Sequence, residues 1–163
     1  MNITLIGMPG SGKSFVGKQL AERLQFDFVE TDALIEKQYN LPLQDVLTKM
    51  GDKAFLAKEE EVVITVTTNR NNIVLSPGGS IIYSERAMKH LGDISRIMYL
   101  DVPLTVIEKR IGGIPRGIVG SDARSLEVLY RERMPLYARW ADHTLDGEQD
   151  AEVLVEEIIR SIK

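Results

Sequence analysis

The stretch Gly7-Met8-Pro9-Gly10-Ser11-Gly12-Lys13-Ser14 decides the fold of this chain, because it matches the phosphate-binding pattern G-x-x-x-x-G-K-[ST]. It follows the apolar run Ile3–Ile6, which predicts a buried strand, and it leads into apolar residues at helical spacing in Ser14–Leu24. The motif requires this strand–loop–helix setting, which disfavours the alternative of a chance glycine-rich turn. The sequence therefore predicts a binding site for the phosphates of a nucleoside triphosphate.

The residue types of this loop suit a triphosphate and a metal ion. Gly7, Gly10 and Gly12 permit backbone angles that turn several N–H groups toward one anion. The N-terminus of the following helix adds partial positive charge. We expect Lys13 to reach the β- and γ-phosphates and the Ser14 hydroxyl to ligate Mg²⁺.

Length and composition exclude several classes of protein. The chain has 163 residues, 44% of them hydrophobic and 27% charged, which predicts one globular domain over residues 1–163. A net charge of −4 argues against an extended nucleic-acid surface, and the absence of cysteine excludes disulfides, thiolate catalysis and zinc–sulfur sites. No apolar run approaches the roughly 18 residues of a membrane span, and only two residues precede the first strand, too few for a signal peptide. We expect a cytoplasmic monomer with no nucleic-acid or membrane partner.

Apolar strands alternate with helical patterns, which predicts an α/β, three-layer fold with a five-stranded parallel sheet flanked by helices. The expected strands are Ile3–Ile6, Phe26–Thr31, Ile73–Leu75, Ile97–Leu100 and His143–Leu145. The expected helices are Ser14–Leu24, Asp32–Gln38, Leu43–Met50, Asp52–Thr68, Ser84–Leu91, Pro103–Ile111, Ser121–Trp140 and Asp150–Ile162. Pro135 should kink or end its helix. Thr31 or Asp32 should cap the helix that follows the second strand, and Gly51 should end the third helix.

Two acidic residues, Glu30 and Asp32, leave the second predicted strand at the edge where parallel sheets bind ligands. A carboxylate beside a transferred phosphate can hold metal-bound water or accept the proton of the acceptor hydroxyl. The alternative is that Asp32 only caps the next helix.

Gly78 and Gly79 end the third predicted strand at the same edge of the sheet. Glycine there lets a ligand approach the backbone and exposes N–H donors. The alternative is a plain turn.

Three arginines, Arg110, Arg116 and Arg133, follow the fourth predicted strand. Phosphoryl transfer spreads charge over phosphate oxygens, which arginines stabilise. Glycines on both sides of Arg116 suit a lid over residues 112–121 that opens and closes. Each arginine taken alone could equally be a solvated surface charge.

The chain resembles the shikimate kinase family over nearly its whole length. The family motifs are a phosphate loop, an acidic pair, a Gly-Glu-x-x-Phe-Arg-x-x-Glu run, three glycines, an arginine before glycines, an arginine-bearing lid and Arg-x-Pro-Leu-Tyr. They stand here as Gly7–Ser14, Glu30-Thr31-Asp32, Gly51-Asp52-Lys53-Ala54-Phe55-Leu56-Ala57-Lys58-Glu59, Gly78-Gly79-Ser80, Arg110 with Gly112 and Gly113, Arg116-Gly117-Ile118-Val119, and Arg133-Met134-Pro135-Leu136-Tyr137.

The resemblance implies ATP and Mg²⁺ on the donor side. The residues expected around the ATP phosphates are Gly10, Ser11, Gly12, Lys13, Ser14 and Phe15. Arg110 is expected against adenine, and Arg116 is expected to reach the phosphates from the lid. Ser14 is the implied metal ligand, with Glu30 and Asp32 acting through water. The turn at Asp146–Gln149 resembles the family segment that brushes adenine.

On the acceptor side the resemblance implies a small hydroxylated carboxylate, bound in a region over residues 32–60. Asp32 is expected to bind or deprotonate its hydroxyl, with Lys13, Asp32 and Arg116 as the catalytic residues. Gly78 and Gly79 are expected to line the acceptor site, Gly79 through its N–H. Arg133 is expected to pair with the acceptor carboxylate.

The chain departs from the family pattern at several positions. Glu30 replaces an aspartate, Ser80 replaces the third glycine, and the lid is about one residue shorter. Leu56 replaces an arginine that, with the arginine at the position of Arg133, clamps the carboxylate of shikimate. Losing one partner of a charge-assisted pair typically costs about 1.5–3 kcal/mol. Lys53, one helical turn earlier, could partly substitute as a point charge.

Three functions remain open on the sequence. The first is phosphoryl transfer from ATP to shikimate, giving shikimate 3-phosphate. The second is a related kinase for another polyol or hydroxy acid, because Leu56 makes the acceptor pocket less cationic. The third is a non-catalytic ATP-binding regulatory or interaction domain, which is disfavoured because the chain retains Lys13, Ser14, Asp32 and Arg116.

Overall fold

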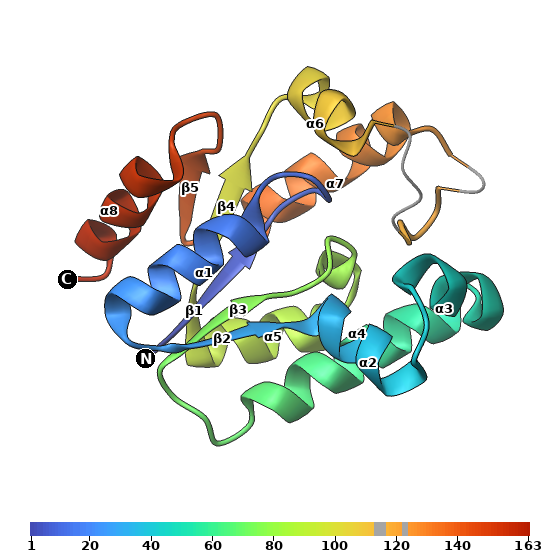
Figure 1. Ribbon diagram of the computed structural model, residues 1–163, viewed down its shortest axis with the longest axis horizontal. Coiled ribbons are helices and arrows are strands. Elements are labelled where there is room, and N and C mark those ends of the chain that lie inside the picture. Colours follow the sequence, from blue (N-terminus) through green and yellow to red (C-terminus); the bar gives the residue numbers. More distant parts are fainter. Residues whose placement is uncertain (113–116, 122–123) are drawn as a thin grey trace.

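The computed structural model describes residues 1–112, 117–121 and 124–163, and its centre is a parallel sheet (Figure 1). The five strands lie in the order β2-β3-β1-β4-β5. Their bounds are β1 Asn2–Ile6, β2 Asp27–Glu30, β3 Ile73–Ser76, β4 Ser95–Asp101 and β5 His143–Asp146. The predicted five-stranded parallel sheet of an α/β fold is confirmed.

Strand β1 lies at the centre of the sheet, where it pairs with β3 on one side and β4 on the other. Ile3 is in register with Val74 of β3 and with Arg96 of β4. All five residues of β1 are buried, as expected for a strand covered on both faces. The phosphate loop therefore starts from the most constrained strand of the sheet, which holds it at the carboxyl edge.

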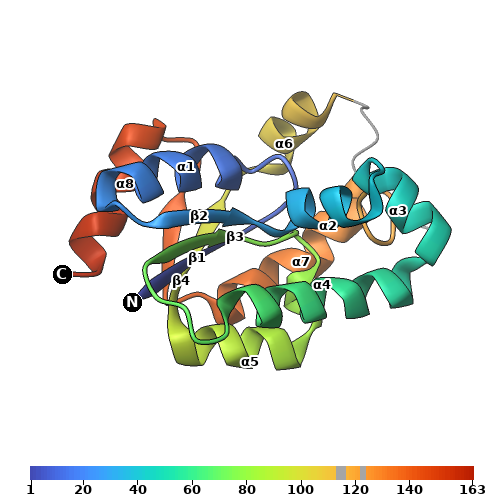
Figure 2. The same cartoon turned by 60° about the horizontal axis from the view of Figure 1, so that its bottom comes forward.

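Helices cover both faces of the sheet, with α1 and α8 on one face and α5 and α7 on the other (Figure 2). Their bounds are α1 Lys13–Leu24, α2 Thr31–Tyr39, α3 Leu43–Met50, α4 Asp52–Thr67, α5 Glu85–Ile94, α6 Leu104–Ile111, α7 Leu126–Trp140 and α8 Ala151–Ser161. A short 3-10 helix, η1 Ile81–Tyr83, was not expected. Each face encloses its own apolar core, and a third apolar cluster joins α2, α3 and α4.

The start of α2 differs from the prediction. Glu30 occupies the capping position, and neither Thr31 nor Asp32 caps the helix, because both already lie in its first turn. The alternative interpretation of Asp32, that it only caps this helix, is therefore wrong. Gly51 ends α3 with a φ of 79°, as predicted.

Helix α7 also differs from the prediction. It begins at Leu126 rather than Ser121, and the Ser125 hydroxyl caps it by accepting from the Val128 N–H. Pro135 does not end the helix, which continues to Trp140. Proline removes one backbone donor, but the buried side of α7 packs along the sheet and keeps the last turn in place.

Within residues 1–112, 117–121 and 124–163, none of the helices combines the length and apolar character that crossing a membrane demands.

Candidate active site

The phosphate loop is built by glycine conformations that other residues rarely adopt. Gly10 has a φ of 81° and Gly12 a φ of 97°, and Gly12 is the residue that caps α1. This geometry turns the loop backbone around the helix N-terminus, where anions bind well. The predicted Gly7, Gly10, Gly12 turn is thus present in the structure.

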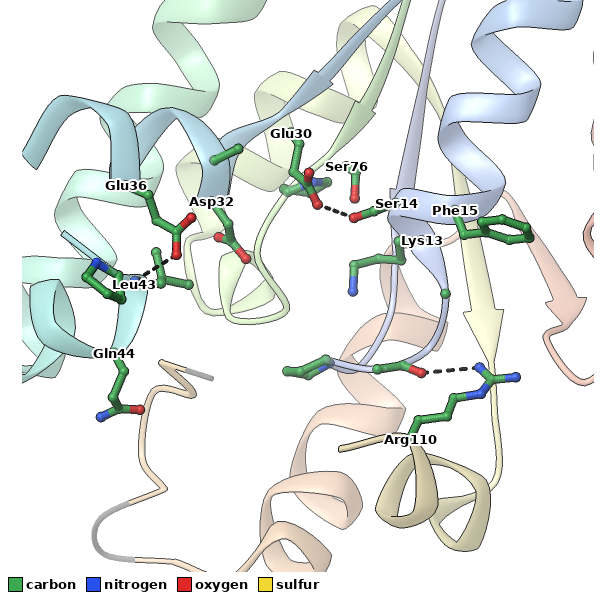
Figure 3. A pocket seen from close by; sticks show the side chains of 16 residues that line it. Lys13, Ser14, Phe15, Glu30, Asp32, Glu36, Leu43, Gln44, Ser76 and Arg110 are labelled. Carbon is green, nitrogen blue, oxygen red and sulfur yellow. Dashed lines mark hydrogen bonds between the residues drawn. The ribbon is translucent and has the colours of Figure 1, made fainter. Parts of the chain in front are cut away.

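Lys13 lies buried beneath the loop (Figure 3). Its Nζ donates to the carbonyls of Gly7 at 2.9 Å and Met8 at 3.0 Å. Burial lowers the pKa of Lys13 to about 8, and the negative charge of Asp32 acts in the opposite direction. The ammonium is therefore held in place and faces an acidic partner.

A cavity of about 660 Å³ opens in front of the loop and joins it to α2 and α3. Its lining residues are Pro9, Gly10, Gly12, Lys13, Ser14, Phe15, Glu30, Asp32, Ala33, Glu36, Pro42, Leu43, Gln44, Ser76, Pro77 and Arg110. Phe15 is 65% exposed at its margin, and Arg110 donates to the Gly10 carbonyl at 3.2 Å. The aromatic ring and the guanidinium border the same end of the cavity (Figure 3).

Acidic side chains from α2 and β2 face the loop across this cavity. The Ser14 hydroxyl donates to the carboxylate of Glu30. Asp32 Oδ1 is buried and has no hydrogen-bond partner among the described residues. Burial raises the pKa of Asp32 to about 6, while Lys13 pulls it down and Glu30 raises it further. A buried carboxylate oxygen with no protein partner indicates a group that a ligand completes.

These oxygen atoms suit a magnesium ion. Ser14 and Glu30 are in hydrogen-bond contact, and Asp32 supplies an unpartnered oxygen at the same cavity. Mg²⁺ prefers oxygen ligands and keeps several waters, so it needs few direct protein ligands beside the phosphates of a nucleotide. The structure thus brings together the residues from which the sequence predicted a metal site.

Ser11 was predicted only as one of the loop residues around the ATP phosphates, and the structure adds a feature of its side chain. Its hydroxyl is buried and has no hydrogen-bond partner within the described residues. It and Asp32 are the two side chains of this kind in residues 1–112, 117–121 and 124–163. Both lie at the phosphate loop or directly opposite it.

A smaller cavity of about 50 Å³ lies deeper, between the phosphate loop, the end of β3 and α7. Its lining residues are Pro9, Lys13, Asp32, Leu43, Glu59, Gly78, Gly79, Ser80, Gly117, Ile118, Val119 and Arg133. Lys13 and Asp32 line both cavities, so they stand where the two spaces meet. The deeper cavity is the candidate acceptor site.

Gly78 and Gly79 are required by close packing. A Cβ on Gly78 would lie 2.0 Å from Glu59 Oε1 and 2.8 Å from Asp32 Oδ1. A Cβ on Gly79 would lie 2.9 Å from Pro9 Cδ. The side chains of Glu59, Asp32 and Pro9 therefore approach this backbone closely, as the sequence predicted for a ligand. The Gly78 N–H donates to the Thr31 hydroxyl at 3.3 Å.

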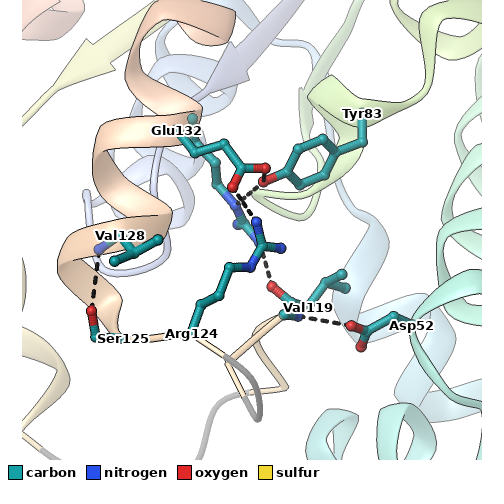
Figure 4. Close-up of polar contacts among 9 residues, drawn as sticks. Asp52, Tyr83, Val119, Arg124, Ser125, Val128 and Glu132 are labelled. Atoms are coloured by element: carbon teal, nitrogen blue, oxygen red, sulfur yellow. Dashed lines mark hydrogen bonds and ion pairs between the residues drawn. The ribbon is translucent and has the colours of Figure 1, made fainter.

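Arg133 lies at the wall of the deeper cavity and is only 1% exposed. Its Nη2 donates to the Val119 carbonyl at 2.8 Å, and its Nε donates to the Tyr83 hydroxyl at 3.3 Å. The Tyr83 hydroxyl in turn donates to Glu132 at 2.9 Å (Figure 4). These bonds hold the guanidinium in one orientation, and a guanidinium has five N–H donors, more than these two bonds use.

Leu56 does not line either cavity. It is partly buried and packs against the apolar cluster of α2, α3 and α4. Lys53 is exposed and also lines neither cavity, so the suggestion that it substitutes for a missing arginine finds no support in the geometry. Among the described residues, Lys13 and Arg133 are the cations of the deeper cavity.

Glu59 is the residue of this site that the sequence analysis missed. It is 1% exposed, and the Ser80 hydroxyl donates to its Oε2. Burial raises its pKa to about 8, nearby Asp32 raises it further, and the Ser80 hydrogen bond lowers it. A sequence signal exists, because Glu59 falls four residues after buried Phe55 and three before buried Val62, on the apolar side of α4.

Two predicted contacts cannot be placed at the site. Arg116 lies outside the described residues. Asp146 and Glu148 line a separate hollow with Asp101 and Tyr130, rather than the cavity in front of the phosphate loop.

Comparison with known proteins points to one family. A family model described as shikimate kinase matches residues 9–163. A shikimate kinase from Thermobifida fusca is 35% identical over 161 residues, which cover 94% of this chain and 92% of that relative. The solved shikimate kinase from Acinetobacter baumannii in complex with shikimate is 30% identical, with a TM-score of 0.88 over 99% of this chain and 92% of that one. The enzyme from Aquifex aeolicus is 29% identical, with a TM-score of 0.83 over 99% of this chain and 96% of that one.

Proposed function

This chain belongs to the shikimate kinase family, and we propose that it transfers the γ-phosphoryl group of ATP to a hydroxyl of shikimate. It is an ATP-dependent phosphotransferase of the P-loop type. The solved structure of the Acinetobacter relative is a complex with shikimate, which supports a small hydroxylated carboxylate as the acceptor of this chain. Shikimate carries hydroxyls, which suit Asp32 on one side of the deeper cavity, and a carboxylate, which suits Arg133 on the other.

One observation carries the proposal. The ammonium of Lys13 and the unpartnered carboxylate of Asp32 stand together where the two cavities meet. Phosphoryl transfer needs a cation at the migrating group and a proton acceptor at the attacking hydroxyl. A buried cation and a buried carboxylate at a junction between a donor space and an acceptor space meet both needs.

On the donor side, the loop N–H groups and Lys13 would bind the triphosphate, with Lys13 lying toward the transferred group. Phe15 and Arg110 would border the base, since both stand at the open end of the large cavity. Ser14 would ligate Mg²⁺ directly, with Glu30 and Asp32 holding its water. When bound, Mg²⁺ would neutralise charge on the phosphate oxygens. Arg116 is assigned to the transferred phosphate on the family resemblance alone.

On the acceptor side, Asp32 would orient the attacking hydroxyl and accept its proton. A pKa of about 6 suits this role, because a base is most effective when its pKa lies near the working pH. The Gly79 N–H would bind the acceptor at the end of β3. Arg133 would bind the acceptor carboxylate, with its orientation already set by Val119 and Tyr83.

A second candidate is a kinase of the same kind with a different acceptor. The observation that favours it is the absence of a second guanidinium at the deeper cavity within the described part of the chain. Leu56 packs into an apolar cluster instead. An acceptor whose anionic group binds weakly could be held by Arg133 without a second guanidinium.

The deciding experiment is a coupled assay of ADP release with ATP, Mg²⁺ and a panel of acceptors. The panel contains shikimate, other ring and chain hydroxy acids, and sugars without a carboxylate. Turnover of shikimate above all other acceptors is the expected result. Turnover of another acceptor with none of shikimate would establish the second candidate, and ATP binding without turnover of any acceptor would refute both.

A further inference from the structure

The deeper cavity contains a polar pair that the mechanism above does not use. The Ser80 hydroxyl donates to Glu59 Oε2, and both residues are buried and line the cavity. The bond joins α4 to the loop before η1, across 21 positions of sequence. Among the described residues, Ser80 is the sole hydrogen-bond partner of the Glu59 carboxyl.

Within the described residues the Glu59 carboxyl forms no ion pair, although the nearby charges of Arg133 and Lys13 act to lower its pKa. Arg133 donates hydrogen bonds to Val119 and Tyr83, and Lys13 donates to the carbonyls of Gly7 and Met8. Leu56, one turn before Glu59 on α4, packs away into an apolar cluster. A buried carboxyl with so few partners is sensitive to the loss of any one of them.

The second oxygen of Glu59 faces the cavity. A Cβ built on Gly78 would lie 2.0 Å from Glu59 Oε1 and 2.8 Å from Asp32 Oδ1, so both oxygens approach the same point beside Gly78. Asp32 is the residue assigned to the attacking hydroxyl. An acceptor that brings one hydroxyl to Asp32 therefore brings the neighbouring part of its ring or chain to Glu59.

We propose that Ser80 is a positioning residue of the acceptor site, which holds Glu59 so that its free oxygen recognises a second hydroxyl of the acceptor. The inference rests on the proposed function, because it takes the deeper cavity as the acceptor site. Ser80 stands where the family motif has a glycine, and a glycine offers no hydroxyl. Because Leu56 replaces the family arginine one turn before Glu59, the hydrogen bond to the Glu59 carboxyl comes from the neutral Ser80 hydroxyl rather than from a guanidinium.

The test uses Ser80→Ala, Glu59→Gln and the double variant, each assayed for the KM of shikimate, the KM of ATP and kcat. Ser80 has a φ of −85°, so alanine fits its backbone without strain. We expect Ser80→Ala to raise the KM of shikimate roughly three- to tenfold and Glu59→Gln to raise it roughly tenfold to a hundredfold. The KM of ATP should stay within about twofold. In the double variant, Ser80→Ala should add little to Glu59→Gln, because both changes act through one bond.

The neighbouring pair Ser84 and Glu60 provides a matched control. The Ser84 hydroxyl donates to Glu60 at 2.6 Å, and neither residue lines the two cavities. Ser84→Ala also removes the cap of α5, so it should lower the melting temperature and leave the KM of shikimate unchanged. Glu60→Gln should likewise leave that KM unchanged.

The outcomes separate the inference from the proposed function. An unchanged KM for shikimate in Ser80→Ala, or full additivity in the double variant, overturns the inference while wild-type turnover upholds the function. Equal rises in both KM values with a lower melting temperature also overturn it, since they indicate a structural role. If the wild type phosphorylates another acceptor instead, the same variants are compared on that acceptor. A wild type that phosphorylates no acceptor overturns the function and the inference together.

Discussion

Replacing Asp32 with asparagine should strongly lower kcat and at the same time stabilise the fold. The substitution keeps the shape of the side chain and removes its charge and its capacity to accept a proton. Loss of a general base typically lowers kcat by about 10²- to 10⁴-fold. ATP affinity should change little, because the loop that binds the phosphates is untouched.

The stability effect follows from the pKa of Asp32, which burial raises from an ordinary value of 3.8 to about 6. When folding raises the pKa of a carboxyl, ionisation of that carboxyl lowers the free energy of unfolding. The destabilisation grows as pH rises from about 4 to about 6 and is constant above that. One pKa unit corresponds to roughly 1.4 kcal/mol, so Asp32→Asn should stabilise the protein by about 3 kcal/mol at pH 7.5. Below pH 4 the gain should vanish.

Urea unfolding at pH 3.5, 5.5 and 7.5 without Mg²⁺ would measure the stability, and the coupled assay would measure kcat. Asp93→Asn is the control, because Asp93 is exposed near the end of α5 and lines neither cavity. A variant with near-normal kcat would remove Asp32 from the mechanism. A variant no more stable than the wild type at pH 7.5 would refute the claim that the folded protein holds an ionised Asp32 at a cost.

Three further substitutions test the rest of the site. Lys13→Met should lower kcat by about 10²- to 10³-fold, because it removes a buried cation aimed at the transferred group; a circular dichroism spectrum like that of the wild type would show that the fold survives. Arg133→Lys should raise the KM of shikimate roughly tenfold, because lysine cannot donate to Val119 and Tyr83 while also binding a carboxylate with a planar fork; an unchanged KM would place the carboxylate elsewhere. Leu56→Arg should leave the KM of shikimate unchanged, because Leu56 packs into the apolar cluster of α2, α3 and α4 and lines neither cavity; a lowered KM would show that this position reaches the acceptor.

Much of the fold was predictable because its signals are local. Runs of apolar residues predicted all five strands to within one or two residues, and the Gly7–Ser14 motif located the donor site. Boundaries that depend on capping were predicted less well. The start of α2 fell at Thr31 rather than Asp32, and α7 began at Leu126, after the Ser125 cap, rather than at Ser121, while its end at Trp140 was as predicted.

The sequence by itself determined that this chain binds a triphosphate at Gly7–Ser14 and carries acidic and basic groups at the carboxyl edge of a parallel sheet. Only the tertiary structure decided which of those groups meet. Ser80 reaches Glu59 across 21 positions, and Arg133 reaches Tyr83 across 50. Such contacts leave no periodic trace in the sequence, because they depend on strand order and on how helices from distant segments pack around one cavity.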